Sequence, residues 1–337
     1  MDLADWVRFY VYDTITTLLY GVPVGMIQEG RDVDDLIVSW HDMFALAGLV
    51  ATLPWLINTA ITTWPFKSSS MPRKGHSGGA GHIMNVHERL FRERLNHPER
   101  AVPGNLFDAI CSSKHMDSTP ISLEEAEHES YLLTVAAQDS TPGFIAPLLH
   151  FIVSDERVYD RVMQEIDDIE VRGSLSNPVA TFDETSAMPF FMACCQETLR
   201  LQPPTPITLP RFVPPQGIDY NGTFLPPGAE IGANPHLIHR SEEMFGADTE
   251  KFVPERWLKS AASARSMEKS MLVWGYGSRK CIGKHIAMFE SQKLVIHLLR
   301  EFRISPTDEG SPPHMENWGI NVFMDQFVTL NERRSMS

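Results

Sequence analysis

The sequence of 337 residues predicts a mainly α fold with small β-sheets, an α+β arrangement in a single large domain. Three observations support this prediction. Apolar residues recur at helical spacing through residues 1–201. From Gln202 to residue 280, prolines and glycines cluster between short runs of β-forming residues. A last helical stretch at 281–302 then leads into a strand-rich tail at 303–337, where we expect a C-terminal β-hairpin.

The composition is that of a globular protein, with 43% hydrophobic and 21% charged residues. The 43 acidic residues exceed the 29 basic ones, giving a formal net charge of −14. Non-specific nucleic-acid binding needs a surplus of positive charge, so this function class is disfavoured. Four scattered cysteines, Cys111, Cys194, Cys195 and Cys281, predict no disulfide framework and fit a reducing compartment.

The N-terminal helices follow from periodicity and from residues that end helices. A helix over Asp2–Tyr20 is ended by Gly21 and Pro23, residues 33–61 predict one or two helices, and 82–95 predict another. The start of the chain has no basic and apolar signal-peptide pattern and no N-terminal anchor pattern. We therefore expect this chain to be cytoplasmic or peripheral to a membrane.

Residues 43–66 carry no charge and form a run long enough to cross a bilayer. Pro54, Asn58 and several threonines lower its hydropathy, so we favour a buried or surface helical hairpin over a membrane span. A shallow peripheral contact with a membrane stays open as an alternative.

A long central helix is predicted over residues 123–153. Ser122 and Glu125 form a capping-box pattern at its start. Pro142 lies inside the helix and removes a backbone hydrogen bond, so we expect the helix to open at residues 137–141. The alternative is a simple break into two helices.

Two shorter helices are predicted over 155–169 and 189–201. Irregular chain is expected from the last short strand to Leu272, and residues 320–330 are expected to form the hairpin of the tail. The predicted short strands are 208–213, 219–220, 223–225 and 230–233.

The segment from Trp274 to Gly283 carries the sharpest chemical pattern. Its glycines, Gly275, Gly277 and Gly283, allow tight turns and close approach of a bulky group. Cys281 falls at the mouth of a helix, where partial positive charge favours a thiolate, and Arg279 and Lys280 add positive charge. Such a thiolate suits a metal ligand or a nucleophile, and the alternative is a structural cysteine.

This segment resembles the haem-binding loop of the cytochrome P-450 family, F-x-x-G-x-R-x-C-x-G, with Trp274 in the usual Phe position. The resemblance implies that Cys281 is the axial ligand of the iron of haem b. It also places Trp274, Gly275 and Gly283 against the cofactor, and Arg279 and Arg211 near its propionates, because Arg pairs with carboxylates.

Further motifs occur in the family's order. Glu197 and Arg200 form E-x-x-R, and Arg256 lies in a segment similar to P-E-R-F. The resemblance implies that these three residues form a buried cluster that supports the haem loop. The segments 203–208 and 317–324 correspond to parts of the family's substrate pocket.

Residues 136–141 are similar to the family's oxygen-activation segment, [A/G]-G-x-[D/E]-T-T, with Ala137 replacing the usual Gly. The resemblance implies that Asp139, together with Ser140 or Thr141, delivers protons to bound dioxygen. The alternative is an ordinary polar patch on a helix.

The overall sequence pattern resembles that of filamentous-fungal members of the family, such as pisatin demethylase and benzoate hydroxylase-like enzymes. This implies a haem-thiolate monooxygenase that inserts one oxygen atom from dioxygen into an apolar small molecule, in fungal secondary-metabolite biosynthesis. Electrons would come from NADPH through a reductase, docked on a basic face formed by Arg279, Lys280, Lys284 and Lys293. A non-catalytic relic or haem-binding fragment, and a haem-thiolate isomerase or dehydratase, stay open as alternatives.

The resemblance covers the C-terminal part of the family's fold. Its anchor, first strands and a propionate-binding helix have no counterpart, so we expect an N-terminally truncated form with an exposed strand edge at 219–233. A full-length form would lie on the cytoplasmic side of the endoplasmic reticulum, and this chain could touch a membrane through 43–66.

Overall fold

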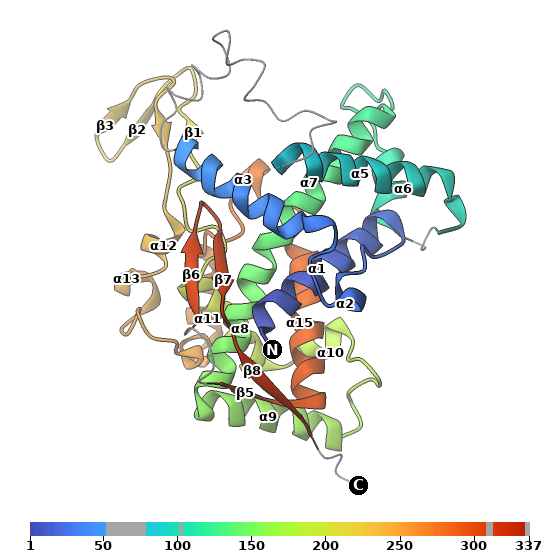
Figure 1. Cartoon of the computed structure of the whole chain (residues 1–337). Helices are drawn as coiled ribbons and strands as arrows, with labels where there is room; N and C mark the ends of the chain where they lie inside the picture. The colour runs from blue at the N-terminus through green and yellow to red at the C-terminus, as the bar shows by residue number, and fades with distance from the viewer. Residues whose placement is uncertain (52–78, 101–103, 308–312, 334–337) are drawn as a thin grey trace. The chain divides into compact units, whose positions relative to one another are not determined.

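The computed structural model describes residues 1–51, 79–100, 104–307 and 313–333 (Figure 1). It contains two compact units. The N-terminal unit comprises Asp2–Pro142 and Glu316–Trp318. The C-terminal unit comprises Met1, Gly143–Met315 and Gly319–Ser337.

The described part of the N-terminal unit is helical, with α1 (Leu3–Tyr20), α2 (Met26–Glu29), α3 (Leu36–Ala51), α5 (Gly79–Asn96), α6 (Leu106–Cys111) and α7 (Leu123–Ser140). Asp2 caps α1 by accepting a hydrogen bond from the Ala4 N–H. Gly21 ends this helix at φ +79°, and a Cβ there would collide with the Arg100 carbonyl oxygen. The predicted capping box of Ser122 and Glu125 is present at the start of α7.

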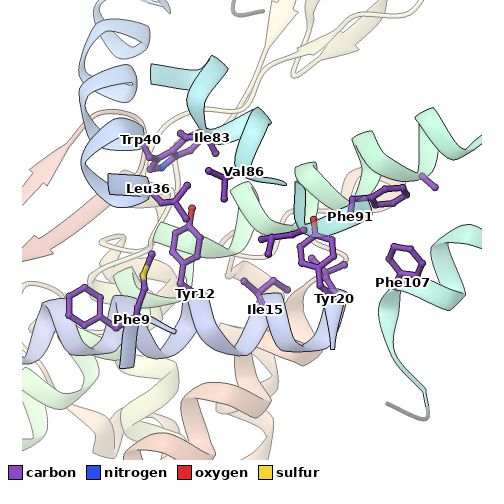
Figure 2. Packing of buried hydrophobic residues seen from close by; sticks show 14 residues of the cluster. Phe9, Tyr12, Ile15, Tyr20, Leu36, Trp40, Ile83, Val86, Phe91 and Phe107 are labelled. Atoms are coloured by element: carbon purple, nitrogen blue, oxygen red, sulfur yellow. The ribbon is translucent and has the colours of Figure 1, made fainter. Parts of the chain in front are cut away.

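One apolar cluster fills the N-terminal unit (Figure 2). Helix α1 contributes Tyr12 and Ile15, α3 contributes Leu36 and Trp40, and α5 contributes Ile83, all of them buried. Because these side chains recur at helical spacing on separate helices, the amphipathic faces predicted from the sequence are the faces that pack together.

The C-terminal unit contains the remaining helices. They are α8 (Pro142–Ser154), α9 (Glu156–Val171), α10 (Phe182–Ser186), α11 (Pro189–Leu201), α12 (Pro235–Ile238), α13 (Glu242–Phe245), α14 (Ala261–Ser270) and α15 (Lys284–Glu301). Helix α11 has the bounds that the sequence predicts, with Pro189 as its first residue, a position that does not need an N–H.

The described strands form two-stranded sheets. Antiparallel pairs join β1 (Arg211–Phe212) to β4 (Glu230–Ile231), β2 (Ile218–Tyr220) to β3 (Thr223–Leu225), and β5 (Phe302–Pro306) to β8 (Val328–Glu332). A further sheet pairs β6 (His314–Asn317) with β7 (Asn321–Met324). The aromatic side chains of Phe212, Tyr220 and Phe224 on the short strands are exposed.

The structure corrects the prediction of one hairpin at residues 320–330. Strand β8 pairs with β5, with Leu330 opposite Ile304, and β7 belongs to a different sheet. The alternating pattern predicted that strands occur in the tail, but it carries no information about their partners. Burial of Ile304 and Val328 on this sheet favours the longer-range pairing.

The stretch from residue 234 to Leu272, expected to be irregular, contains a ten-residue helix, α14. Ser260 caps it by accepting a hydrogen bond from the Ser263 N–H, and Met267 buries its side chain. Because most residues of this segment are polar or small, no apolar periodicity predicted the helix, which buries only Met267.

The predicted central helix is present as α7 and α8, and the interruption between them falls at Thr141, within the residues 137–141 where the sequence predicts that the helix opens. Thr141 lies between them and keeps helical dihedral angles (φ −74°, ψ −46°), while Pro142 becomes the first residue of α8. A proline is favoured at a first helical position because no intrahelical N–H bond is required there.

The uncharged segment 43–66 begins in α3, and its part from residue 52 onward lies outside the described residues. None of the helices in the described part of the chain combines the length and apolar character needed to cross a bilayer.

Candidate active site

The cysteine loop of the C-terminal unit is a tight double turn before α15. Gly275 and Gly277 both adopt the left-handed conformation, with φ of +66° and +64°. The backbone N–H of Cys281 donates to the Trp274 carbonyl at 2.8 Å, which closes the loop. Cys281 then lies two residues before Gly283, the N-cap of α15, and its thiol is exposed.

These residues fit a flat group bound through sulfur. The Cys281 side chain is held by a fixed backbone but is not covered by protein. A Cβ on Gly283 would lie 3.9 Å from the Cys281 Sγ, an ordinary contact distance, so Gly283 lies directly beside the sulfur. An accessible cysteine sulfur is the donor that haem iron takes in the thiolate-ligated proteins.

A buried carboxylate supports the chain that leads into this loop. Glu197 on α11 is fully buried and accepts two hydrogen bonds from Arg200, each at 2.9 Å. It also accepts from Arg256 Nε and Trp257 Nε1, both at 2.9 Å, and from the Val253 N–H at 3.0 Å. The structure thus brings together the three residues that the motifs singled out and adds Trp257.

The two guanidinium groups of this cluster fix the irregular chain between α12 and α14. Arg200 donates to the carbonyls of His239, Thr249 and Lys251. Arg256 donates to the carbonyls of residues 245, 247 and 248. Carbonyls in chain without regular structure need such partners when they are buried, and bidentate arginines supply several at once.

His239 links this support to the beginning of the cysteine loop. Its Nε2 accepts a hydrogen bond of 2.8 Å from the Leu272 N–H, which requires that this nitrogen be unprotonated. Burial lowers the pKa of His239 from 6.5 to about 4, so the imidazole is neutral at physiological pH.

Basic side chains lie in the loop and on the helix that follows it. Lys284 Nζ lies 5.8 Å from the centre of the Trp274 ring in the loop, whereas Lys293 lies further along α15, with its Nζ 4.9 Å from the centre of the Phe289 ring. A cavity of about 620 Å³ is lined by Trp274, Lys280 and Lys284 together with Arg265, Glu268 and Lys269. Arg279 is exposed in the same loop.

Arg211 is exposed on β1, and its guanidinium donates to the carbonyls of Leu209 and Pro210 in its own segment. Within the C-terminal unit, the predicted pocket segment 203–208 contacts residue 321 of the other predicted pocket segment, 317–324. The Asn321 N–H and its side-chain amide donate to the carbonyls of Pro204 and Pro203, each at 2.8 Å.

The predicted oxygen-activation residues lie at the C-terminal end of α7, in the N-terminal unit. Asp139 is buried, and its carboxylate accepts from Trp40 Nε1 at 2.6 Å and lies 3.1 Å from His41 Nε2. The Ser140 hydroxyl donates to the Ala136 carbonyl of its own helix at 2.7 Å. Thr141 is buried directly after α7.

Trp40, His41 and Trp257 belong to these sites although no sequence motif assigned them a role. Trp257 could have been found, because it directly follows Arg256 in the motif. Trp40 and His41 lie 99 and 98 residues from Asp139, and no spacing rule connects them.

Comparisons with known proteins place this geometry in a family. A model of the cytochrome P-450 family matches residues 1–331. The chain is 29% identical to the cytochrome P-450 monooxygenase ACRTS1 of Alternaria alternata, covering 99% of this chain and 88% of that protein. It is 31% identical to the cytochrome P-450 monooxygenase gsfF of Penicillium aethiopicum over 91% of this chain, and spans only 61% of that relative.

The solved haem domain of cytochrome P-450DA has the same fold, with a TM-score of 0.77 at 16% identity, covering 99% of this chain and 68% of that domain. The chain spans 66% of the length of the monooxygenase cicH of Emericella nidulans, to which it is 27% identical. The cysteine loop, the buried glutamate–arginine cluster and the family match over nearly the whole chain lead to one conclusion: this chain belongs to the cytochrome P-450 family.

Proposed function

We propose that the protein is a haem-thiolate monooxygenase that inserts one oxygen atom from dioxygen into an apolar small molecule, in fungal secondary-metabolite biosynthesis. The observation that carries this proposal is the exposed thiol of Cys281, which lies at the end of the closed glycine loop and beside Gly283. The names of the fungal relatives, all monooxygenases, support the reaction class.

Cys281 would hold the iron of haem b, with Trp274, Gly275 and Gly283 beside the cofactor and Arg279 and Arg211 as partners for its propionates. The haem supplies dioxygen binding and O–O cleavage, which a thiolate ligand favours. The Glu197 cluster keeps the cysteine in place, because its arginines hold the preceding backbone in one arrangement.

Asp139 and Thr141 are the proton-handling pair that we propose. An acid and a hydroxyl in sequence can hold a water molecule and pass its proton onward. The Ser140 hydroxyl already donates a hydrogen bond to the Ala136 carbonyl of its own helix, so the buried Thr141 is the better candidate of the two alcohols.

We propose an apolar substrate because the two segments that the family resemblance assigns to the pocket carry apolar residues. A Cβ on Gly319 would lie 3.6 Å from Ile207 Cδ1, and β7 in the second segment contains the apolar residues Val322 and Phe323. The hydrogen bonds from Asn321 to residues 203 and 204 hold these two segments together.

The electron donor we propose is an NADPH-dependent reductase with an acidic docking face. Arg279, Lys280, Lys284 and Lys293 provide positive charge around the cysteine loop, in a protein whose net charge is −14. Opposite local charges steer such encounters and raise association rates. A full-length form on the cytoplasmic side of the endoplasmic reticulum stays a prediction.

The test is the reduced-CO difference spectrum of the expressed chain reconstituted with haem. We expect the red-shifted Soret band of a thiolate–CO complex in the wild type and in Cys111→Ser, whose cysteine lies on α6. The Cys281→Ala variant should lose the band. A wild-type chain that binds no haem would overturn the proposal and favour a non-catalytic relic, while an unchanged band in Cys281→Ala would refute the ligand assignment.

A further inference from the structure

Both oxygens of the Asp139 carboxylate are engaged by one short segment of α3. The Trp40 Nε1–H donates to Oδ2 at 2.6 Å, and His41 Nε2 lies 3.1 Å from Oδ1. All three residues belong to the N-terminal unit, where α3 and α7 are both described. Trp40 is one of the side chains that line the apolar cluster, and it points from α3 into it (Figure 2).

The two partners of Asp139 differ in their contact with solvent. The Asp139 side chain is 4% exposed and the His41 side chain 15% exposed. Trp40 is buried and can only donate a hydrogen bond, whereas an imidazole can both accept and release a proton. His41 is therefore the member of this trio that connects the buried acid with water.

Packed residues hold the trio in this arrangement. The His41 ring contacts the Trp318 ring edge to face, with centroids 5.5 Å apart. Next to Asp139, the Gln138 amide oxygen accepts a 2.6 Å hydrogen bond from the Tyr12 hydroxyl of α1. Among the described residues, His41 is the ion-pair partner recorded for Asp139, and the carboxylate of Asp5 on α1 also interacts with the charge of His41.

We propose that Trp40 and His41 extend the proton relay of Asp139 to solvent. Trp40 is a positioning residue that fixes the carboxylate, and His41 exchanges protons between water and Asp139. This inference rests on the proposed monooxygenase function, since that function gives Asp139 protons to deliver. In a transfer, the protonated imidazole of His41 gives its Nε2 proton to Oδ1 of Asp139 and becomes neutral, and a hydronium ion from solvent then returns one proton to the ring, so that charge balances and nothing is oxidised or reduced.

The contact itself is tested without haem or turnover. In a deuterated chain with ¹⁵N-labelled tryptophan, the indole N–H signal of Trp40 is assigned by its loss in Trp40→Phe. We expect Asp139→Asn to shift this signal and Trp6→Phe, a change in another tryptophan of the same unit, to leave it in place. An unmoved Trp40 signal in Asp139→Asn would overturn the proposal whatever the enzyme does.

The relay is tested in the haem-loaded chain with a P-450 reductase, by the rate of NADPH-driven dioxygen consumption and its solvent isotope effect. His41→Gln keeps a side-chain N–H for Asp139 but cannot exchange a proton. We expect it to slow consumption by about 100-fold, at the lower end of what loss of a general acid or base costs, and to raise the isotope effect. Trp40→Phe should slow consumption while the thiolate–CO band is kept.

The matched control is His128→Gln, which changes an exposed histidine on α7 itself and should leave both readouts at the wild-type level. A wild-type rate and isotope effect in His41→Gln would refute the relay and leave the monooxygenase proposal intact. Failure of the proposed function is recognised separately, as a wild-type chain without the thiolate–CO band, and the indole measurement still decides the contact in that case.

Discussion

Replacing Glu197 by Ala is the sharpest test of how the cysteine loop is supported. The wild-type carboxylate accepts five hydrogen bonds, from both arginines, from Trp257 and from the Val253 N–H. The substitution leaves two buried guanidinium groups without their counter-charge. Each still reaches backbone carbonyls, so the loss falls on charge compensation and on packing rather than on every hydrogen bond.

The expected cost follows from the burial of the pair. Removing one partner of a buried ion pair costs about 3–5 kcal/mol, because an uncompensated charge stays behind. That is on the order of a 10²- to 10⁴-fold change in the unfolding equilibrium constant. For a unit of this size it corresponds to a fall of roughly 6–20 °C in the melting temperature.

The assay measures the melting temperature of the C-terminal unit by thermal unfolding. Retention of haem is the second readout. Glu255→Ala is the matched control, since Glu255 adjoins Arg256 in sequence but forms a partly exposed ion pair with Arg161. An exposed pair contributes about 0–1 kcal/mol, so this variant should melt within a few degrees of the wild type. Equal losses in the two variants would refute the view that the buried cluster carries the support.

Other predictions concern titration and packing in the C-terminal unit. Burial raises the pKa of Glu290 from 4.5 to about 8. The wild type should therefore lose stability relative to Glu290→Gln as the pH rises from 4.5 to 8. Parallel curves of unfolding free energy against pH for the two proteins would contradict this. The pKa of His239 is lowered to about 4, so urea unfolding should show stability being lost as pH falls from 6.5 toward 4, and His239→Gln, whose oxygen can still accept from the Leu272 N–H, should lack that dependence. A Cβ on Gly143 would lie 2.7 Å from the Asn321 carbonyl oxygen, so Gly143→Ala should cost about 1–3 kcal/mol in denaturant unfolding, and an unchanged midpoint would show that the close approach is absent.

Local features of the fold were predictable because their causes are local. The capping box of Ser122 and Glu125, the bounds of α11 and the break caused by Pro142 depend on residues within a few positions of one another. The same holds for the cysteine loop, whose glycines and Cys281 lie in one short segment.

The glutamate–arginine cluster could be predicted only in part, because it depends on both local and long-range contacts. The pair Glu197 and Arg200 shares a helix face and is visible in the sequence, whereas Arg256 was placed with it only through resemblance to the family. Their burial and the carbonyls that the arginines bind depend on how the chain between α12 and α14 is folded. No periodicity describes that irregular chain.

The sequence by itself determined the family, the cysteine that fits a haem ligand and most helices, since each rests on residue types at fixed short spacings. Only the tertiary structure decided that β8 pairs with β5, that α14 is a helix, and that Trp40 and His41 hold Asp139. The strand pairing and the contacts of Asp139 join residues far apart in the chain, and α14 depends on burial of Met267. Their free energy comes from burying particular side chains together, and a pattern read along one segment does not contain the identity of the segment that packs against it.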